Sequence, residues 1–132
     1  LIEAADLLQE LPVEDIHAVE DEARRLLKLG CGAVLIKVGH GSGDVAIDLL
    51  VDKAGCQIFE RPRLITQNTH GTGCTLSAAI TAYLAMGQDL RSAVGCAKEF
   101  VWHALESATQ QKLGHGSGPL DHMHALGTRT CM

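Results

Sequence analysis

The sequence has few aromatic residues and no long apolar run. The aromatic side chains of its 132 residues are Trp102, Tyr83, Phe59 and Phe100. A core without large rings must be built from Ala, Leu, Val and Ile, which suits helices packed closely on a sheet. No apolar run reaches the ~20 residues that a membrane-spanning helix needs. No charged leader followed by an apolar stretch stands at the start. We therefore expect neither a membrane partner nor a secretion signal.

Basic charge is also scarce, since 11 Lys and Arg residues stand against 16 Asp and Glu residues, giving a net charge of −5. A protein dedicated to nucleic acid needs a basic face that displaces counterions from phosphates, so this class is disfavoured. The hydrophobic share of 46% and the charged share of 20% are those of a globular protein. The length suits one domain or part of one.

The cysteines form no recognisable pair. They number five, an odd count, and no two have the C-x-x-C spacing. A disulfide framework or a zinc knuckle is therefore disfavoured, and a reducing cytoplasm is the predicted location. The cysteines at positions 31, 56, 96 and 131 are interpreted as packing or surface residues.

The hydrophobic periodicity predicts alternating helices and strands. Helices are expected over residues 1–10, 13–29, 75–86 and 90–109, and strands over 33–38, 45–51 and 57–59, with a hairpin turn at 52–55 and coil over 113–132. A helix, a tight glycine turn and the apolar run 33–38 follow one another. That order indicates a buried parallel strand and an α/β fold.

The most informative stretch is Asn68-Thr69-His70-Gly71-Thr72-Gly73-Cys74-Thr75, directly before an alanine-rich helix. Two glycines around a threonine can point several backbone N–H groups into one cavity, and the helix adds free N–H groups and the positive end of its dipole. Such a site holds an anion and can stabilise the charge that develops during phosphoryl transfer. The alternative is a structural turn that caps the helix. The flanking polar residues favour the phosphate interpretation.

Cys74 is expected in the first turn of this helix. The dipole and the neighbouring N–H groups would favour its thiolate there, so that it could act as a general base on a substrate hydroxyl. Equally, Cys74 could be a small residue that fits a tight turn. The residues alone do not favour the general base over the small packing residue.

Three segments carry a resemblance to a known family. The stretch T-x-N-T-H-G-T-G-C-T-L-S-A-A-I resembles the signature of the hydroxymethylpyrimidine and phosphomethylpyrimidine kinases of thiamine synthesis, which belong to the ribokinase-like superfamily. Residues 34–40 resemble that family's V-L-V-K-G-G-H, with Val38 replacing a glycine, and residues 114–122 resemble its closing G-x-G-x-G-P-x-x-H. Residues 1–5 look like the end of its N-x-x-E-A segment. The sugar and pyridoxal branches of the superfamily usually have aspartate at position 74. Cysteine there favours the pyrimidine branch, although some bacterial pyridoxal kinases share it.

The resemblance implies roles residue by residue. Gly71, Thr72 and Gly73 would form the anion hole, with Cys74 at the position of the catalytic base. The ATP-binding residues would be Lys37, Gly39 and Thr69, and Glu3 would belong to the magnesium and phosphate network. A carboxylate suits magnesium and a lysine suits phosphate. Taken alone, Glu3 would more often be a solvated helix acid, and Lys37 could extend its ammonium group into solvent.

The resemblance also implies a fold and an activity. The fold would be the C-terminal half of a ribokinase-like three-layer structure, a central, mostly parallel sheet with helices on both faces. Residues 1–122 would form part of one kinase domain and residues 123–132 a tail. The implied activity is phosphorylation of hydroxymethylpyrimidine and then of its monophosphate, with ATP and Mg²⁺. Alternatives are a pyridoxal kinase, or a non-catalytic remnant that binds nucleotide or pairs with another chain.

Two further expectations concern partners and metals. A half-fold would expose sheet edges, so we expect a homo-oligomer or association through those edges. His115, His122 and His124 near the end lack a cysteine or carboxylate cluster at zinc spacing. They are interpreted as part of a solvated or substrate-side tail rather than as a metal site.

Overall fold

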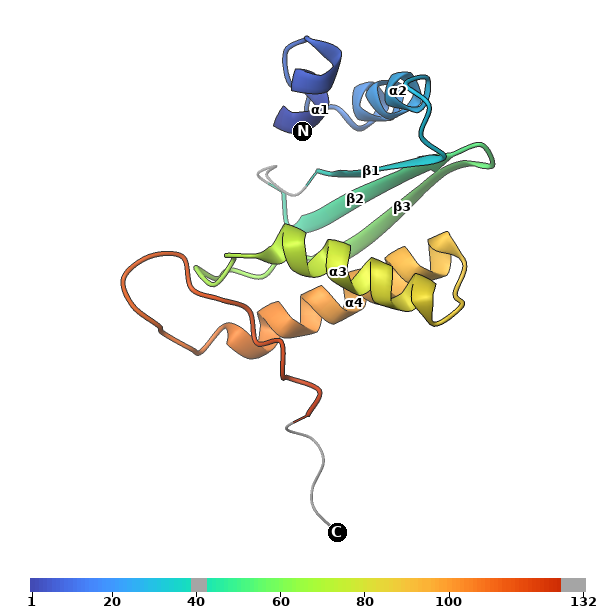
Figure 1. The fold of residues 1–132 in the computed structure, drawn as a ribbon. Coiled ribbons are helices and arrows are strands. Elements are labelled where there is room, and N and C mark those ends of the chain that lie inside the picture. The colour runs from blue at the N-terminus through green and yellow to red at the C-terminus, as the bar shows by residue number, and fades with distance from the viewer. Residues whose placement is uncertain (39–42, 127–132) are drawn as a thin grey trace. The chain divides into compact units, whose positions relative to one another are not determined.

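The computed structural model describes residues 1–38 and 43–126 and divides the chain into two compact units, Leu1–Arg63 and Leu64–Met132. Figure 1 shows both helices and strands, so the predicted α/β class is confirmed. The elements are α1 (Ile2–Leu8), α2 (Ile16–Leu27), β1 (Ala33–Lys37), β2 (Val45–Asp52), β3 (Gly55–Pro62), α3 (Thr72–Ala85) and α4 (Leu90–Ala108).

The sheet of the first unit has the strand order β1-β2-β3, and both pairings are antiparallel. The parallel strand expected at 33–38 is therefore not found among the described residues. A parallel pair needs a crossover of a dozen or more residues, whereas residues 38–44 alone join β1 to β2. The predicted hairpin turn is present, because the Asp52 carboxylate accepts hydrogen bonds from the N–H groups of Ala54 and Gly55 at 2.8 and 3.1 Å.

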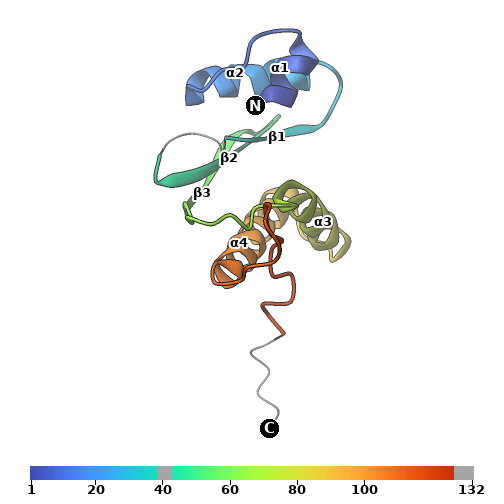
Figure 2. The same ribbon diagram turned by 90° about the vertical axis from the view of Figure 1, so that its left-hand side faces the viewer.

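Helices α1 and α2 cover one face of this sheet, as Figures 1 and 2 show. Helix α2 begins where the Asp15 carboxylate accepts hydrogen bonds from the N–H groups of His17 and Ala18 at 3.0 and 3.1 Å. Its buried apolar residues Val19, Ala23 and Leu26 recur at steps of three or four, the period of a helix. The buried core of the unit consists of Ala4, Val19, Ala23, Leu26, Ile36, Leu49 and Val51.

The second unit is built on an antiparallel helix pair, α3 and α4 (Figure 1). Asp89 caps α4 by accepting a hydrogen bond from the Ser92 N–H at 3.1 Å. Small residues recur along the buried face of α4, which lets helices approach closely. Besides Lys98, the buried residues of α4 are Ala93, Val94, Ala97, Val101, Ala104 and Ala108.

The last part of the second unit is irregular, as the sequence predicts. Residues 113–126 form turns and one isolated parallel bridge between His70 and Pro119. Helix α3 differs from the prediction, because it begins at Thr72 rather than at Thr75. The last two residues of the Gly-Thr-Gly sequence therefore belong to its first turn. In the described part of the chain, no helix combines the length and the apolar character that crossing a membrane requires.

Candidate functional site

Residues 71–73, called the glycine turn below, open helix α3. Gly71 is the N-cap and has a φ of +85°, a left-handed conformation that side chains rarely adopt. The Thr72 N–H donates to the Thr69 carbonyl at 3.4 Å, and the Thr75 N–H donates to the Gly71 carbonyl at 2.9 Å. The local conformation therefore requires glycine at position 71.

The start of α3 has no side-chain cap. Most helices satisfy their first N–H groups with a Ser, Thr, Asp or Asn side chain, as α2 and α4 do. Gly73 and Cys74 lie in this uncapped first turn and are exposed. A Cβ built on Gly73 would meet nothing within 4 Å, so the space in front of these N–H groups is open. The geometry suits an anion bound by backbone donors and the helix dipole.

Cys74 is an exposed free cysteine in this first turn. The second unit thus gathers Thr69, the glycine turn and Cys74 within one loop and helix start. The thiol stands beside the backbone donors, where it can meet a molecule held at the helix end.

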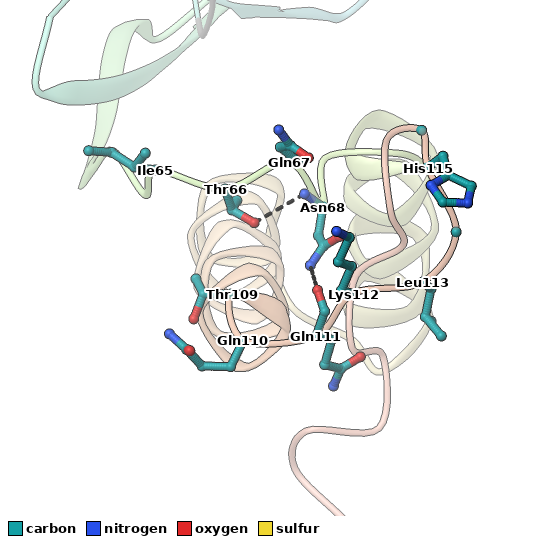
Figure 3. A pocket seen from close by; sticks show the side chains of 12 residues that line it. Ile65, Thr66, Gln67, Asn68, Thr109, Gln110, Gln111, Lys112, Leu113 and His115 are labelled. Atoms are coloured by element: carbon teal, nitrogen blue, oxygen red, sulfur yellow. Dashed lines mark hydrogen bonds between the residues drawn. The ribbon is translucent and has the colours of Figure 1, made fainter.

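Asn68 has a role that the sequence analysis did not assign. Asn68 is 6% exposed, and its side-chain amide nitrogen donates to the Ala108 carbonyl at 2.5 Å. The same nitrogen donates to the Gln111 carbonyl at 2.8 Å (Figure 3). It thereby satisfies carbonyl groups at the end of α4. A Cβ at Gly118 would lie 1.8 Å from the Asn68 side-chain oxygen. The segment before the glycine turn is therefore fixed against residues about forty positions away.

A cavity of about 520 Å³ lies beside Asn68. Its walls are residues 65–68 and 109–116, which include the Lys112 side chain and the glycines at 114 and 116 (Figure 3). This volume lies in the usual range of small-molecule sites. The cavity and the glycine turn share one loop, since only Thr69 and His70 separate Asn68 from Gly71.

The remaining predicted site residues belong to the first unit. Lys37 is the exposed last residue of β1 and stands opposite Asp48 of β2 in the sheet register. Glu3 is an exposed acid in the first turn of α1, and one of its carboxylate oxygens is 3.6 Å from the amino group of Leu1. Gly39 lies outside the described residues. Within the described ranges no three His, Cys, Asp or Glu side chains form a group that could hold a metal ion.

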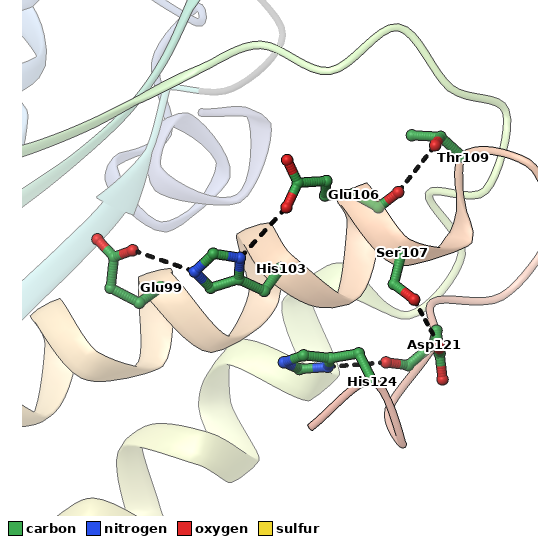
Figure 4. Close-up of polar contacts among 7 residues, drawn as sticks. All are labelled: Glu99, His103, Glu106, Ser107, Thr109, Asp121 and His124. Atoms are coloured by element: carbon green, nitrogen blue, oxygen red, sulfur yellow. Dashed lines mark hydrogen bonds and ion pairs between the residues drawn. The ribbon is translucent and has the colours of Figure 1, made fainter. Parts of the chain in front are cut away.

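Asp121 organises the irregular segment of the second unit. The Ser107 hydroxyl donates to its carboxylate at 2.6 Å (Figure 4), and the Met123 N–H donates to it at 3.0 Å. The Ser107 hydrogen bond is the main reason why the pKa of Asp121 is lowered, followed by the Met123 N–H and by the charges of His124 and His122.

Comparison with known proteins identifies relatives over nearly the whole chain. A family model described as phosphomethylpyrimidine kinase matches residues 1–121. The chain is 42% identical over 125 residues to a hydroxymethylpyrimidine/phosphomethylpyrimidine kinase of Escherichia coli, covering 95% of the chain and 47% of that protein. It is 41% identical over 124 residues to a thiamine biosynthesis bifunctional protein of Geobacter sulfurreducens, covering 94% of the chain and 25% of that protein. The chain thus spans half the length of these relatives or less.

Solved structures resemble the chain closely. The ADP complex of Bacillus subtilis pyridoxal kinase matches with a TM-score of 0.88 and 31% identity, over 97% of the chain and 49% of that structure. A Staphylococcus aureus pyridoxal kinase bound to AMP-PCP and pyridoxal matches with a TM-score of 0.87 and 31% identity, over 97% and 46%.

Proposed function

The chain belongs to the phosphomethylpyrimidine kinase family, and on that premise we propose that it supplies the phosphate-binding and base-carrying part of an ATP-dependent kinase. The substrates are hydroxymethylpyrimidine and its monophosphate, in thiamine synthesis. The observation that carries the proposal is the uncapped start of α3, where the glycine turn opens to solvent beside the Cys74 thiol.

The glycine turn stabilises the phosphoryl group as it moves. The hydroxymethyl oxygen forms a bond to the γ-phosphorus while the bond from that phosphorus to the bridging oxygen of ADP breaks. Negative charge spreads over the oxygens of the transferred group, and the N–H groups of Gly73 and Cys74 are aimed at it. Backbone donors fixed in a helix start need no reorganisation at that moment.

Cys74 takes the proton that the hydroxymethyl oxygen loses as it attacks. In the second phosphorylation the attacking oxygen belongs to a phosphate, which is already ionised near neutral pH. The base therefore matters less for the second step than for the first. The exposure of Cys74 supports this role because a substrate can reach it.

ATP and magnesium are assigned to the other predicted residues. We assign contacts with the nucleotide phosphates to Lys37, Gly39 and Thr69. Mg²⁺ commonly takes one or two protein carboxylates together with phosphate oxygens. The exposed carboxylate of Glu3 fits that requirement. Bound there, the ion neutralises phosphate charge.

The complete kinase has the ribokinase-like three-layer fold under this proposal. Residues 1–122 form the C-terminal part of its single domain, and residues 123–132 form a tail. The mostly parallel sheet arises when further strands join the three antiparallel ones. Open sheet edges then lead to association, as a homo-oligomer or with a separate chain. The cytoplasm is the location we propose, on the grounds of the cysteine pattern.

Pyridoxal phosphorylation is the second candidate activity. It is favoured by the structural similarity to two pyridoxal kinases, one of which holds pyridoxal. The higher identity to pyrimidine kinases supports the first candidate. A non-catalytic remnant that binds nucleotide or pairs with a partner is the third. Measuring kcat/KM for the pyrimidine alcohol and for pyridoxal separates all three when residues 1–132 are completed once with the rest of the E. coli pyrimidine kinase and once with the rest of the B. subtilis pyridoxal kinase.

The test of Cys74 uses a completed enzyme, in which the part of the E. coli relative outside the matched segment is joined to residues 1–132. We expect Cys74→Ala to slow the first phosphorylation about 10²–10⁴-fold, the usual contribution of a general base, and the second much less. Single-turnover kinetics of both steps provide the measurement, with the thermal midpoint as a check on folding.

The matched control is Cys96→Ala, which removes a half-buried cysteine from α4. It should leave both steps close to the parent rates. Equal slowing of the two steps by Cys74→Ala would show that the thiol positions the substrate rather than taking its proton. Unchanged rates would show that the Cys74 thiol takes part in neither step.

A further inference from the structure

Residues 118–124, called the closing segment below, return to the start of α3 after the end of α4. The Gly118 N–H donates to the Gln67 carbonyl at 3.2 Å, and the His70 N–H donates to the Gly118 carbonyl at 3.1 Å. His70 and Pro119 form a parallel bridge. The closing segment thus fixes the chain that leads into the glycine turn.

The same segment is attached to α4 on its other side. Ser107 of α4 donates to the Asp121 carboxylate at 2.6 Å, and the Asp121 N–H donates to the Ala104 carbonyl at 3.0 Å. The His124 ring shares a 3.0 Å hydrogen bond with the Asp121 carbonyl (Figure 4), and it lies 4.9 Å from the Phe100 ring. The closing segment is therefore held by a helix of 19 residues.

One side-chain contact joins this held segment to the exit of the glycine turn. His122 Nε2 and Thr75 Oγ1 share a hydrogen bond of 2.9 Å. Thr75 is 9% exposed, and its N–H donates to the Gly71 carbonyl at 2.9 Å. The β-branched side chain of Thr75 has few rotamers, so a fixed hydroxyl also fixes the backbone of the first turn.

We propose that His122 is a positioning residue, which aims the N–H groups of Gly73 and Cys74 by holding Thr75. The inference rests on the proposed function and adds to it a residue far along the chain. The bridge at His70 fixes the entry of the glycine turn, and the hydrogen bond from His122 fixes its exit. The first turn of α3 has no side-chain cap, so without the second contact it is free to fray at the point where the anion binds.

The first experiment uses the chain itself with inorganic phosphate as the probe. Two-dimensional ¹H–¹⁵N NMR follows the amides of Gly73 and Cys74, their hydrogen exchange and the phosphate Kd. We expect His122→Ala to speed exchange of both amides and to raise the Kd about fivefold, the equivalent of one typical hydrogen bond. The thermal midpoint should stay within error, because an exposed side chain contributes little to global stability.

Two variants serve as rescue and control. His122→Gln keeps a side-chain nitrogen donor and should restore most of the slow exchange and the tighter Kd. His17→Ala removes another exposed histidine, one that lies on α2 in the first unit. It should change neither quantity. Thr75→Val should reproduce the effect of His122→Ala on amide exchange and on the phosphate Kd. The double variant Thr75→Val/His122→Ala should exceed neither single variant in these effects, because both changes remove the same contact.

The second experiment separates this inference from the proposed function. In the completed enzyme, His122→Ala should lower kcat for both phosphorylations by a similar factor and leave KM for the pyrimidine unchanged. Unaltered exchange of Gly73 and Cys74 in His122→Ala would overturn the positioning role, whatever the parent's activity. If His122→Ala alters the exchange of Gly73 and Cys74 but the parent completed enzyme has no kinase activity, the positioning role of His122 is upheld and the proposed function is rejected.

Discussion

Gly73 meets two requirements that favour different residues. Its place in the first turn of α3 suits alanine, because glycine is the poorer helix former and a Cβ would meet nothing within 4 Å. The proposed phosphate site needs that same open space for an anion to approach the backbone. Gly71 differs, since its φ of +85° requires glycine for conformation alone.

The change Gly73→Ala should therefore raise stability and lower activity together. We expect the free energy of unfolding to rise by up to about 1 kcal/mol, the difference in helix propensity. In the completed enzyme we expect kcat to fall about 10²–10³-fold, as when one oxyanion donor is lost. Urea unfolding and steady-state kinetics measure the two effects.

Gly32→Ala is the matched control, because this glycine also has open space around it and lies in the first unit, outside the proposed site. It should leave kcat unchanged. A Gly73→Ala enzyme with the parent kcat would show that no anion approaches the glycine turn.

At the scale of an element, α2 carries an acid where its pattern calls for an apolar residue. Glu22 is fully buried between Val19 and Ala23 along the apolar face, and neither carboxylate oxygen has a hydrogen-bond partner. Burial removes the hydration of a carboxylate, and without a hydrogen bond to replace it this destabilises the folded chain. Helix α2 therefore holds its place through its apolar neighbours and despite Glu22.

Glu22→Met should stabilise the chain by about 1–3 kcal/mol, the usual cost of a buried unsatisfied polar group. Urea unfolding followed by circular dichroism measures this change. Glu20→Met is the control, because Glu20 forms a partly exposed ion pair with Arg24 one turn along the same helix. Such pairs contribute about 1 kcal/mol or less. Destabilisation by Glu22→Met would reveal a partner that the carboxylate needs.

The attachment of the closing segment to α4 should depend on pH. The pKa of Asp121 is lowered mainly by the Ser107 hydroxyl. An unfolded aspartate titrates near about 3.9, so the stabilisation is fully present above that pH and is lost as the pH falls through the lower pKa of the folded chain. Ser107→Ala should destabilise the chain at neutral pH, and the difference from the parent should shrink in strong acid.

Urea unfolding at a series of pH values from neutral to strongly acidic gives the measurement. Ser107→Thr keeps the hydroxyl and should retain the pH dependence of the parent. A difference between Ser107→Ala and the parent that stays constant over the whole range would mean that Ser107 acts by packing and not through the Asp121 carboxylate.

At the level of the whole molecule, the chain matches only part of the length of its relatives, and this bears on its activity. The chain covers 47% of its E. coli relative, although that relative matches 95% of the chain. A kinase of this family must bring the pyrimidine alcohol, ATP and the base into contact, and such positioning supplies much of the rate acceleration. We therefore expect that the part of the enzyme spanned by these residues does not hold both substrates by itself.

Purified residues 1–132 should therefore show no turnover of the pyrimidine alcohol with ATP. A coupled ADP assay measures this, with the completed enzyme as the positive control. Phosphorylation by the chain alone, at a rate that Cys74→Ala abolishes, would contradict the expectation and show that both substrates bind within these residues.

Patterns confined to neighbouring residues were sufficient to predict local structure. The hydrophobic periodicity predicted α2 and α4, and the composition of residues 52–55 predicted the hairpin. The motif around the glycine turn predicted a helix start, although α3 begins three residues earlier than expected. Each of these depends on contacts within a few positions, which a single sequence displays directly.

The sequence by itself determined the helices, the strands, the family resemblance and the identity of the glycine turn. Tertiary structure decided what lies outside those local patterns, namely the antiparallel pairing of β1, the burial of Glu22 and the roles of Asn68 and His122. Asn68 meets its partners forty positions away, and His122 meets Thr75 across 47. Such contacts exist only once the chain has folded back on itself, because no local periodicity specifies which distant residues become neighbours.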